Sequence, residues 1–86
     1  MKTFNDLYFK PHPHVDGVIS RIQFDNGYGA SVVKHDFSYG GKDGLYELAV
    51  LDTKGEITYS THITNDVVGY LNESEVTDLL EQIQKL

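Results

Sequence analysis

Residues 18–51 read VISRIQFDNGYGASVVKHDFSYGGKDGLYELAVL, and apolar and polar side chains alternate along three parts of this segment. Alternation with a period of two is typical of β-strands that bury one face. The predicted strands are residues 18–24, 28–35 and 45–51, and turns that contain glycine separate them. The pattern therefore predicts an antiparallel meander of at least three strands.

The first turn, Asp-Asn-Gly at residues 25–27, allows two pairings of its flanking strands. A two-residue Asn-Gly loop would place the apolar residues of the two strands on different faces. A three-residue loop with a left-handed glycine pairs Phe24 with Tyr28. The same register sets Ile22 opposite Ala30. Only this second register gives one apolar face, so we predict a type I turn with a glycine bulge.

Residues 52–55, Asp-Thr-Lys-Gly, predict a four-residue turn into a fourth strand at residues 56–63. Closing this turn with Leu51 opposite Glu56 would set Val50 beside Ile57. That register again makes a continuous apolar face.

The C-terminal part predicts helical structure. Residues 64–71 favour a short turn or helix that Thr64-Asn65-Asp66 would cap and that a glycine keeps short. Residues 73–85 predict a longer helix, with Asn72 as N-cap and Glu75 completing a capping box. Its apolar residues follow the spacing of one helical face: Val76, Leu79, Leu80, Ile83 and Leu86.

These elements predict a single α+β domain over residues 1–86. Its sheet, residues 18–63, would be a four-stranded antiparallel β-meander with the C-terminal α-helix packed on one face. Residues 1–17 form an N-terminal arm, which the two prolines of Pro11-His12-Pro13-His14 stiffen.

Composition excludes several classes of function. The chain carries 13 acidic and 7 basic side chains and a formal charge of −6, which disfavours direct binding to nucleic acid or to an anionic membrane. It has no cysteine, so disulfides and thiolate chemistry are excluded. The polar residues of the N-terminus do not match a signal peptide, and we therefore expect a cytoplasmic protein.

Catalytic and metal-binding patterns are weak. His12 and His14 lie two apart in an extended segment and could chelate a metal ion, but His35 and His62 are distant in sequence. We therefore interpret the Pro-His-Pro-His segment as a connector. Gly27-Tyr28-Gly29 lies in a hairpin, where it cannot cradle a phosphate. No nucleophile motif occurs, and we expect neither enzymatic activity nor a cofactor.

Binding is the remaining class of function. Six tyrosines and four phenylalanines are more than so small a domain can bury, and aromatic residues are enriched in protein interfaces. The glycine-rich loop between the second and third strands is the predicted site, together with an aromatic residue before the prolines. The candidate binding residues are Phe37, Tyr39, Gly40, Gly41, Lys42 and Tyr8. The alternative for Tyr8 and Phe9 is packing on the open face of the sheet.

Three segments resemble small uncharacterised proteins encoded by tailed bacteriophages and prophages. They are FDNGYGASVV at residues 24–33, GLYELAVL at residues 44–51 and THITNDVVGYL at residues 61–71. The similar pattern extends over residues 17–86. This resemblance implies a viral accessory protein in the cytoplasm of a bacterial host, and it carries no functional residues with it.

Three functions remain open. The first is an interaction module that binds a bacterial host protein, for example one that acts in defence, and inhibits or redirects it. A homodimer of this chain is an open form of the same hypothesis. The second is a binder that sequesters a nucleotide or another small ligand, with the glycine-rich loop closing over it. The third is a structural or assembly role in the virion.

Overall fold

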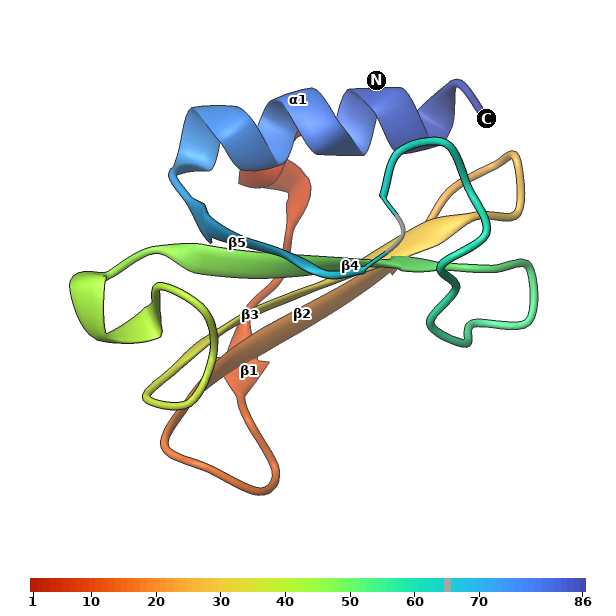
Figure 1. Ribbon diagram of the computed structural model, residues 1–86. Coiled ribbons are helices and arrows are strands. Elements are labelled where there is room, and N and C mark those ends of the chain that lie inside the picture. The colour runs from red at the N-terminus through yellow and green to blue at the C-terminus, as the bar shows by residue number, and fades with distance from the viewer. Residues whose placement is uncertain (65) are drawn as a thin grey trace.

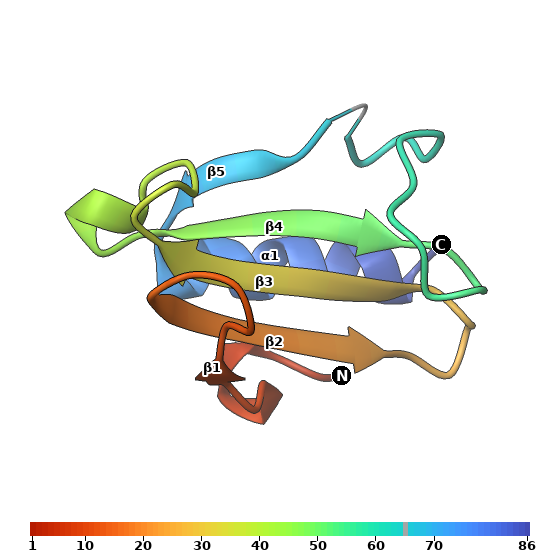
Figure 2. The ribbon, with the colours of Figure 1, turned by 90° about the horizontal axis from the view of Figure 1, so that it is seen from below.

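The computed structural model describes residues 1–64 and 66–86. Within these residues the chain forms a five-stranded antiparallel sheet in the order β1-β2-β3-β4-β5, and α1 crosses one face (Figure 1). Figure 2 shows the opposite face, with the strands in front of α1. The elements are η1 (Phe4–Asp6), β1 (Lys10–Pro11), β2 (Gly17–Gln23), β3 (Gly29–His35), η2 (Gly41–Asp43), β4 (Tyr46–Leu51), β5 (Val68–Leu71) and α1 (Glu73–Gln84). The α+β meander with its C-terminal helix is confirmed, with one strand more than predicted.

The β2–β3 hairpin has the predicted register. The amide of Phe24 donates to the carbonyl oxygen of Tyr28 at 2.7 Å, and Gly27 has a φ of +93°. Ile22 lies opposite Ala30, as expected for a three-residue loop with a glycine bulge. This register turns Ile22, Ala30 and Val32 towards the core beneath α1.

The core lies between the sheet and α1. The helix contributes Val76, Leu80 and Ile83, each fully buried, because they recur on one helical face. Burying one such side chain contributes about 1.5–3 kcal/mol. The buried side chains that form the core cluster are Phe24, Ala30, Val32, Leu48, Val50, Leu71, Val76, Leu80 and Ile83.

Hydrogen bonds close both ends of α1. At the N-terminus, the Asn72 side chain accepts from the amide of Glu75 at 2.8 Å, and the Glu75 carboxylate accepts from the amide of Asn72 at 3.0 Å. The predicted capping box is therefore present. At the C-terminus, the side-chain amide of Asn26 donates to the carbonyl oxygen of Ile83 at 2.9 Å. The β2–β3 turn thus caps the last turn of the helix.

The N-terminal segment packs along α1. The amide of Phe4 donates to the Thr77 hydroxyl at 3.0 Å. The Phe4 and Phe9 rings lie 5.1 Å and 5.4 Å from the ring of Tyr46, between centroids, beside the helix-covered face. Phe9 therefore packs on the helix side and not on the open face, whereas Tyr8 is 82% exposed.

The predicted fourth strand at residues 56–63 is wrong, because the turn before it has one residue fewer than expected. Asp52 donates its amide to the carbonyl oxygen of Glu56 at 2.7 Å, and Gly55 has a φ of +79°. Leu51 therefore lies opposite Ile57. A shift of one residue moves every side chain to the other face of a sheet, so Ile57 points away from the core.

The chain leaves the sheet soon after this turn. The amide of Thr58 still donates to the carbonyl oxygen of Val50 at 2.9 Å. Beyond it, Tyr59 is 52% exposed and lies outside the strands. The position that residues 59–63 were predicted to occupy beside β4 is taken by β5.

The short turn or helix predicted at residues 64–71 is also corrected, because residues 68–71 form β5. Val68 lies opposite Leu48, and Leu71 lies opposite Tyr46. Leu71 is buried and Val68 packs against the core, so pairing with β4 buries apolar surface that an isolated turn would leave in water. The part of the predicted cap formed by Asn65 lies outside the described residues.

Candidate functional site

The loop between β3 and β4, which contains three glycines, folds into successive hydrogen-bonded turns. The amide of Ser38 donates to the carbonyl oxygen of His35 at 3.1 Å, and that of Gly41 donates to the carbonyl oxygen of Ser38 at 3.1 Å. Residues 41–43 then form η2. The hydroxyl of Ser38, which is buried, donates to the carbonyl oxygen of His35 at 2.8 Å. These hydrogen bonds fix the backbone from which the exposed side chains of the loop project.

Two close approaches join this loop to β5. A Cβ on Gly69 would overlap the Cβ of Tyr39, and a Cβ on Gly40 would lie 2.8 Å from the Cα of Tyr70. Only glycine fits where two backbones approach so closely. The amide of Tyr70 then donates to the carbonyl oxygen of Tyr39 at 3.0 Å. The loop therefore packs against the edge strand of the sheet (Figure 2).

A carboxylate of β4 holds the same loop from its other side. The amide of Tyr39 donates to Oε1 of Glu47 at 3.0 Å. A hydrogen bond to a charged acceptor is typically stronger than one between neutral groups. Both backbone polar groups of Tyr39 therefore have a partner, while its side chain is 58% exposed.

Tyr70 has a positive φ of 56°, in the left-handed region where a residue with a Cβ is strained. It belongs to a β-bulge, because Gly69 and Tyr70 together face the single residue Glu47. The conformation costs about 1 kcal/mol or more, yet the Tyr70 side chain is 60% exposed. Strain of this kind is often kept at functional positions.

We define the aromatic surface as Phe37, Tyr39 and Tyr70. Phe37 is 80% exposed, and all three side chains come from one loop and the strand packed against it. Two of them were predicted from the sequence. Tyr70 was missed, because residues 64–71 were interpreted as a short turn or helix, although Val67, Val68 and Tyr70 are residue types that are enriched in strands.

The other predicted binding residues have different positions. Lys42 is exposed in η2 beside the aromatic surface, whereas Gly40 is buried and Gly41 is half-buried, so these glycines shape the loop. Gly41 leaves no room for a Cβ, which would overlap the carbonyl oxygen of His35. Tyr8 lies between η1 and β1, at the opposite edge of the sheet from β5.

A hollow of about 370 Å³ adjoins the aromatic surface. Tyr70 lines it together with loop residues that include the acidic Asp36 and Asp43 and the basic Lys42. The remaining lining residues are Ser38 and Gly40. Because the Ser38 hydroxyl is already bonded to His35, the residues left to contact a ligand are the three charged ones and Tyr70, whose side chain is 60% exposed.

Three histidines come together beside this loop. The ring centroids of His12 and His35 are 5.1 Å apart, those of His12 and His14 are 6.0 Å apart, and Phe37 follows 6.4 Å from His35. Nδ1 of His12 accepts from the amide of His14, and Nδ1 of His35 accepts from the amide of Phe37, each at 3.1 Å. Over residues 1–64 and 66–86, no group of three or more His, Asp or Glu side chains is placed to hold a metal ion.

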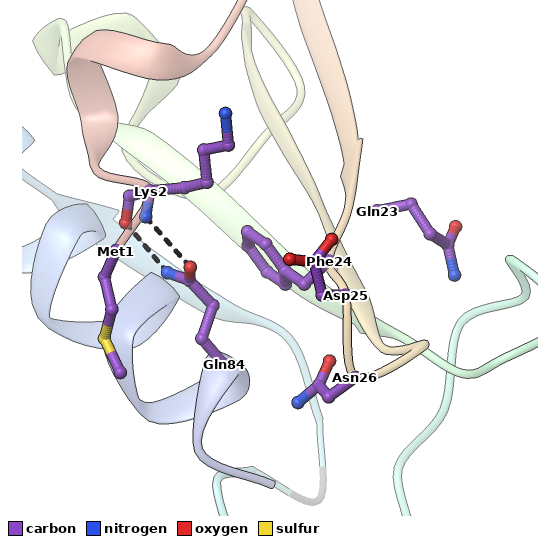
Figure 3. A pocket seen from close by; sticks show the side chains of 7 residues that line it. All are labelled: Met1, Lys2, Gln23, Phe24, Asp25, Asn26 and Gln84. Atoms are coloured by element: carbon purple, nitrogen blue, oxygen red, sulfur yellow. Dashed lines mark hydrogen bonds between the residues drawn. The ribbon is translucent and has the colours of Figure 1, made fainter.

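A second hollow, of about 290 Å³, lies between the N-terminal residues, the β2–β3 turn and the end of α1 (Figure 3). The Gln84 side chain donates to the carbonyl oxygen of Lys2 at 2.8 Å and accepts from its amide at 2.9 Å. Asn26 caps the helix from the same hollow. We assign these polar groups a structural role, because they hold the terminal segment and the turn against α1.

No helix in the part of the chain that the structure describes is long and apolar enough to cross a membrane. Comparisons with protein-family models, with curated proteins and with solved structures found no match to this chain.

Proposed function

We propose that the chain is a non-enzymatic interaction protein that binds another protein through the aromatic surface. The observation that supports this most is the exposed side chain of Tyr70 on a strained backbone. Exposing an aromatic ring gives up the free energy of its burial, and here the backbone strain adds to that cost. Both costs would be offset if a partner buried the ring, since tyrosines are enriched among the residues that dominate binding energy.

The ordered loop favours the same function. Association costs less when the contact residues already have their bound conformation. The bonds of Tyr39 to Glu47 and Tyr70 fix the backbone on which two of the three aromatic side chains stand. A loop that closes over a nucleotide would instead need freedom to move, and its hollow carries two carboxylates that would repel a phosphate.

The setting of this binding is a proposal that follows from the resemblance to bacteriophage proteins. In it, the partner is a bacterial protein in the host cytoplasm, and binding inhibits or redirects that protein. The negative net charge of −6 supports a protein partner over nucleic acid.

The test is capture from bacterial lysate followed by a binding measurement with the purified captured protein. We expect replacement of Phe37 and Tyr39 by alanine to weaken binding about 30-fold or more, which corresponds to the loss of one or two hot-spot residues. Tyr59→Ala is the matched control, because it removes an exposed tyrosine outside the aromatic surface. If the wild type, the Phe37/Tyr39 double alanine variant and Tyr59→Ala all bound the captured protein equally well, the proposal would be overturned.

A further inference from the structure

We infer that the partner contacts the aromatic surface with an arginine side chain, which enters the hollow beside Tyr70. This inference rests on the proposed function, because it names the chemistry of the partner. It concerns the part of the aromatic surface where Tyr70 and the ionisable residues Asp36, Lys42 and Asp43 line the same hollow.

The charges of the hollow favour a cation. Asp36 and Asp43 contribute two carboxylates and Lys42 one ammonium group, so the hollow carries a net charge of −1 within a chain of net charge −6. Glu47, whose carboxylate accepts from the amide of Tyr39, adds another negative charge near the aromatic surface. An anionic group would meet repulsion here, and an apolar group would remove water from carboxylates without replacing it.

The Tyr70 ring favours arginine over lysine. A guanidinium group is planar, stacks on an aromatic face and donates two parallel hydrogen bonds to a carboxylate. A cation over an aromatic ring is also attracted by the charge distribution of the ring. The hollow of about 370 Å³ is large enough to admit one side chain and too small and open to enclose a folded segment. Phe37 and Tyr39 would then contact the partner around that side chain.

The sign of the Lys42 effect separates this inference from binding of an anion. Lys42 lines the hollow and repels a guanidinium group. Lys42→Glu should therefore tighten binding of an arginine ligand about threefold, which is the size expected for exposed charges. Asp36→Asn combined with Asp43→Asn should weaken it about tenfold. For an anionic ligand, Lys42→Glu should weaken binding and the double asparagine variant should strengthen it.

The experiment is a titration of the ¹⁵N-labelled protein with N-acetyl-arginine amide, followed by the backbone amide signals. N-acetyl-citrulline amide, which is neutral and nearly isosteric, and N-acetyl-glutamate amide are the control ligands. We expect the arginine probe to move the signals of residues 36–44 and 69–71, and citrulline to move them at least fivefold less. Tyr70→Gly should abolish the response while the protein stays folded, since glycine suits a positive φ.

Three outcomes would overturn the inference: no movement of these signals, an equal response to citrulline, or a stronger response to the glutamate probe. The proposed function fails separately. If a lysate protein binds through Phe37 and Tyr39 but the arginine probe has no effect, the interaction function stands and the arginine contact is wrong. If the arginine probe binds and the alanine variants leave lysate capture unchanged, the hollow binds cations but the proposed use of the aromatic surface is wrong.

Discussion

The backbone amide of Tyr70 donates a 3.0 Å hydrogen bond to the carbonyl oxygen of Tyr39, and this bond joins the β3–β4 loop to the edge strand β5. Thirty-one positions separate the two residues along the chain, by their numbers. The contact requires glycine at 40 and at 69, where the two backbones approach. It therefore brings together the backbones of two exposed tyrosines, each from a different element.

Glycine at position 70 should relieve the strain of the bulge. Alanine keeps a Cβ and stays strained at a φ of 56°, whereas glycine adopts this conformation without steric cost. We expect Tyr70→Gly to have a free energy of unfolding about 1 kcal/mol higher than Tyr70→Ala. Urea unfolding of the two variants measures the difference. Equal stabilities would mean that the backbone at this position is not strained.

The approach of the loop to β5 should make Gly69 intolerant of a side chain. In Gly69→Ala, the added Cβ would overlap the Cβ of Tyr39, and relieving that overlap should cost about 1–3 kcal/mol of unfolding free energy. Gly44→Ala is the matched control, because no atom lies within 4 Å of its added Cβ and only its φ of +78° opposes the change. The control should lose about 1 kcal/mol. A Gly69→Ala variant as stable as wild type would contradict the loop–β5 contact.

Asn26 should matter because of its bond to α1. Its side-chain amide donates to the carbonyl oxygen of Ile83 at 2.9 Å, and its Oδ1 accepts from the amide of Tyr28 at 3.1 Å. Asn26→Asp keeps the acceptor for Tyr28 but loses the donor and sets a negative charge near the negative end of the helix dipole. We expect Asn26→Asp to lose about 1 kcal/mol or more, as measured by thermal or urea unfolding. If Asn26 stabilised only the turn, Asn26→Asp would leave the free energy of unfolding unchanged.

The fifth strand can be tested by comparing Leu71 with Tyr59. Leu71 is buried in the core and pairs opposite Tyr46, so Leu71→Ala should cost about 2–4 kcal/mol of unfolding free energy. Tyr59 is 52% exposed, and Tyr59→Ala should change stability by no more than about 0.5 kcal/mol. If Tyr59→Ala lost more unfolding free energy than Leu71→Ala, residues 56–63, and not β5, would complete the sheet.

The exposed loop aromatics were predictable in part. Phe37 and Tyr39 stand among glycines in a connecting segment, and loops of this composition lie at the surface. Tyr70 could not be assigned with them, because its exposure depends on the bulge opposite Glu47 and on the contact with Tyr39. The meeting of His12 with His35 likewise follows from the pairing of β1, β2 and β3, and not from any spacing in sequence: Gly17 lies opposite His35, and its carbonyl oxygen accepts from the amide of His12.

The amino-acid sequence by itself determined the elements whose partners are close in the chain. The register of the β2–β3 hairpin follows from the left-handed Gly27, and the start of α1 follows from the capping box of Asn72 and Glu75. Gly55 carries the same turn signal as Gly27, but a longer turn would have given a more continuous apolar face, and that competing pattern favoured the wrong register.

Only the tertiary structure decided which segment pairs with β4 along its free edge. Residues 56–63 are adjacent in sequence and rich in β-forming residues, yet their register turns Ile57 away from the core. Residues 68–71 bury Leu71 and pack Val68 against the core. The burial of apolar surface against α1 therefore outweighs the entropic cost of closing the longer loop, which grows only slowly with loop length.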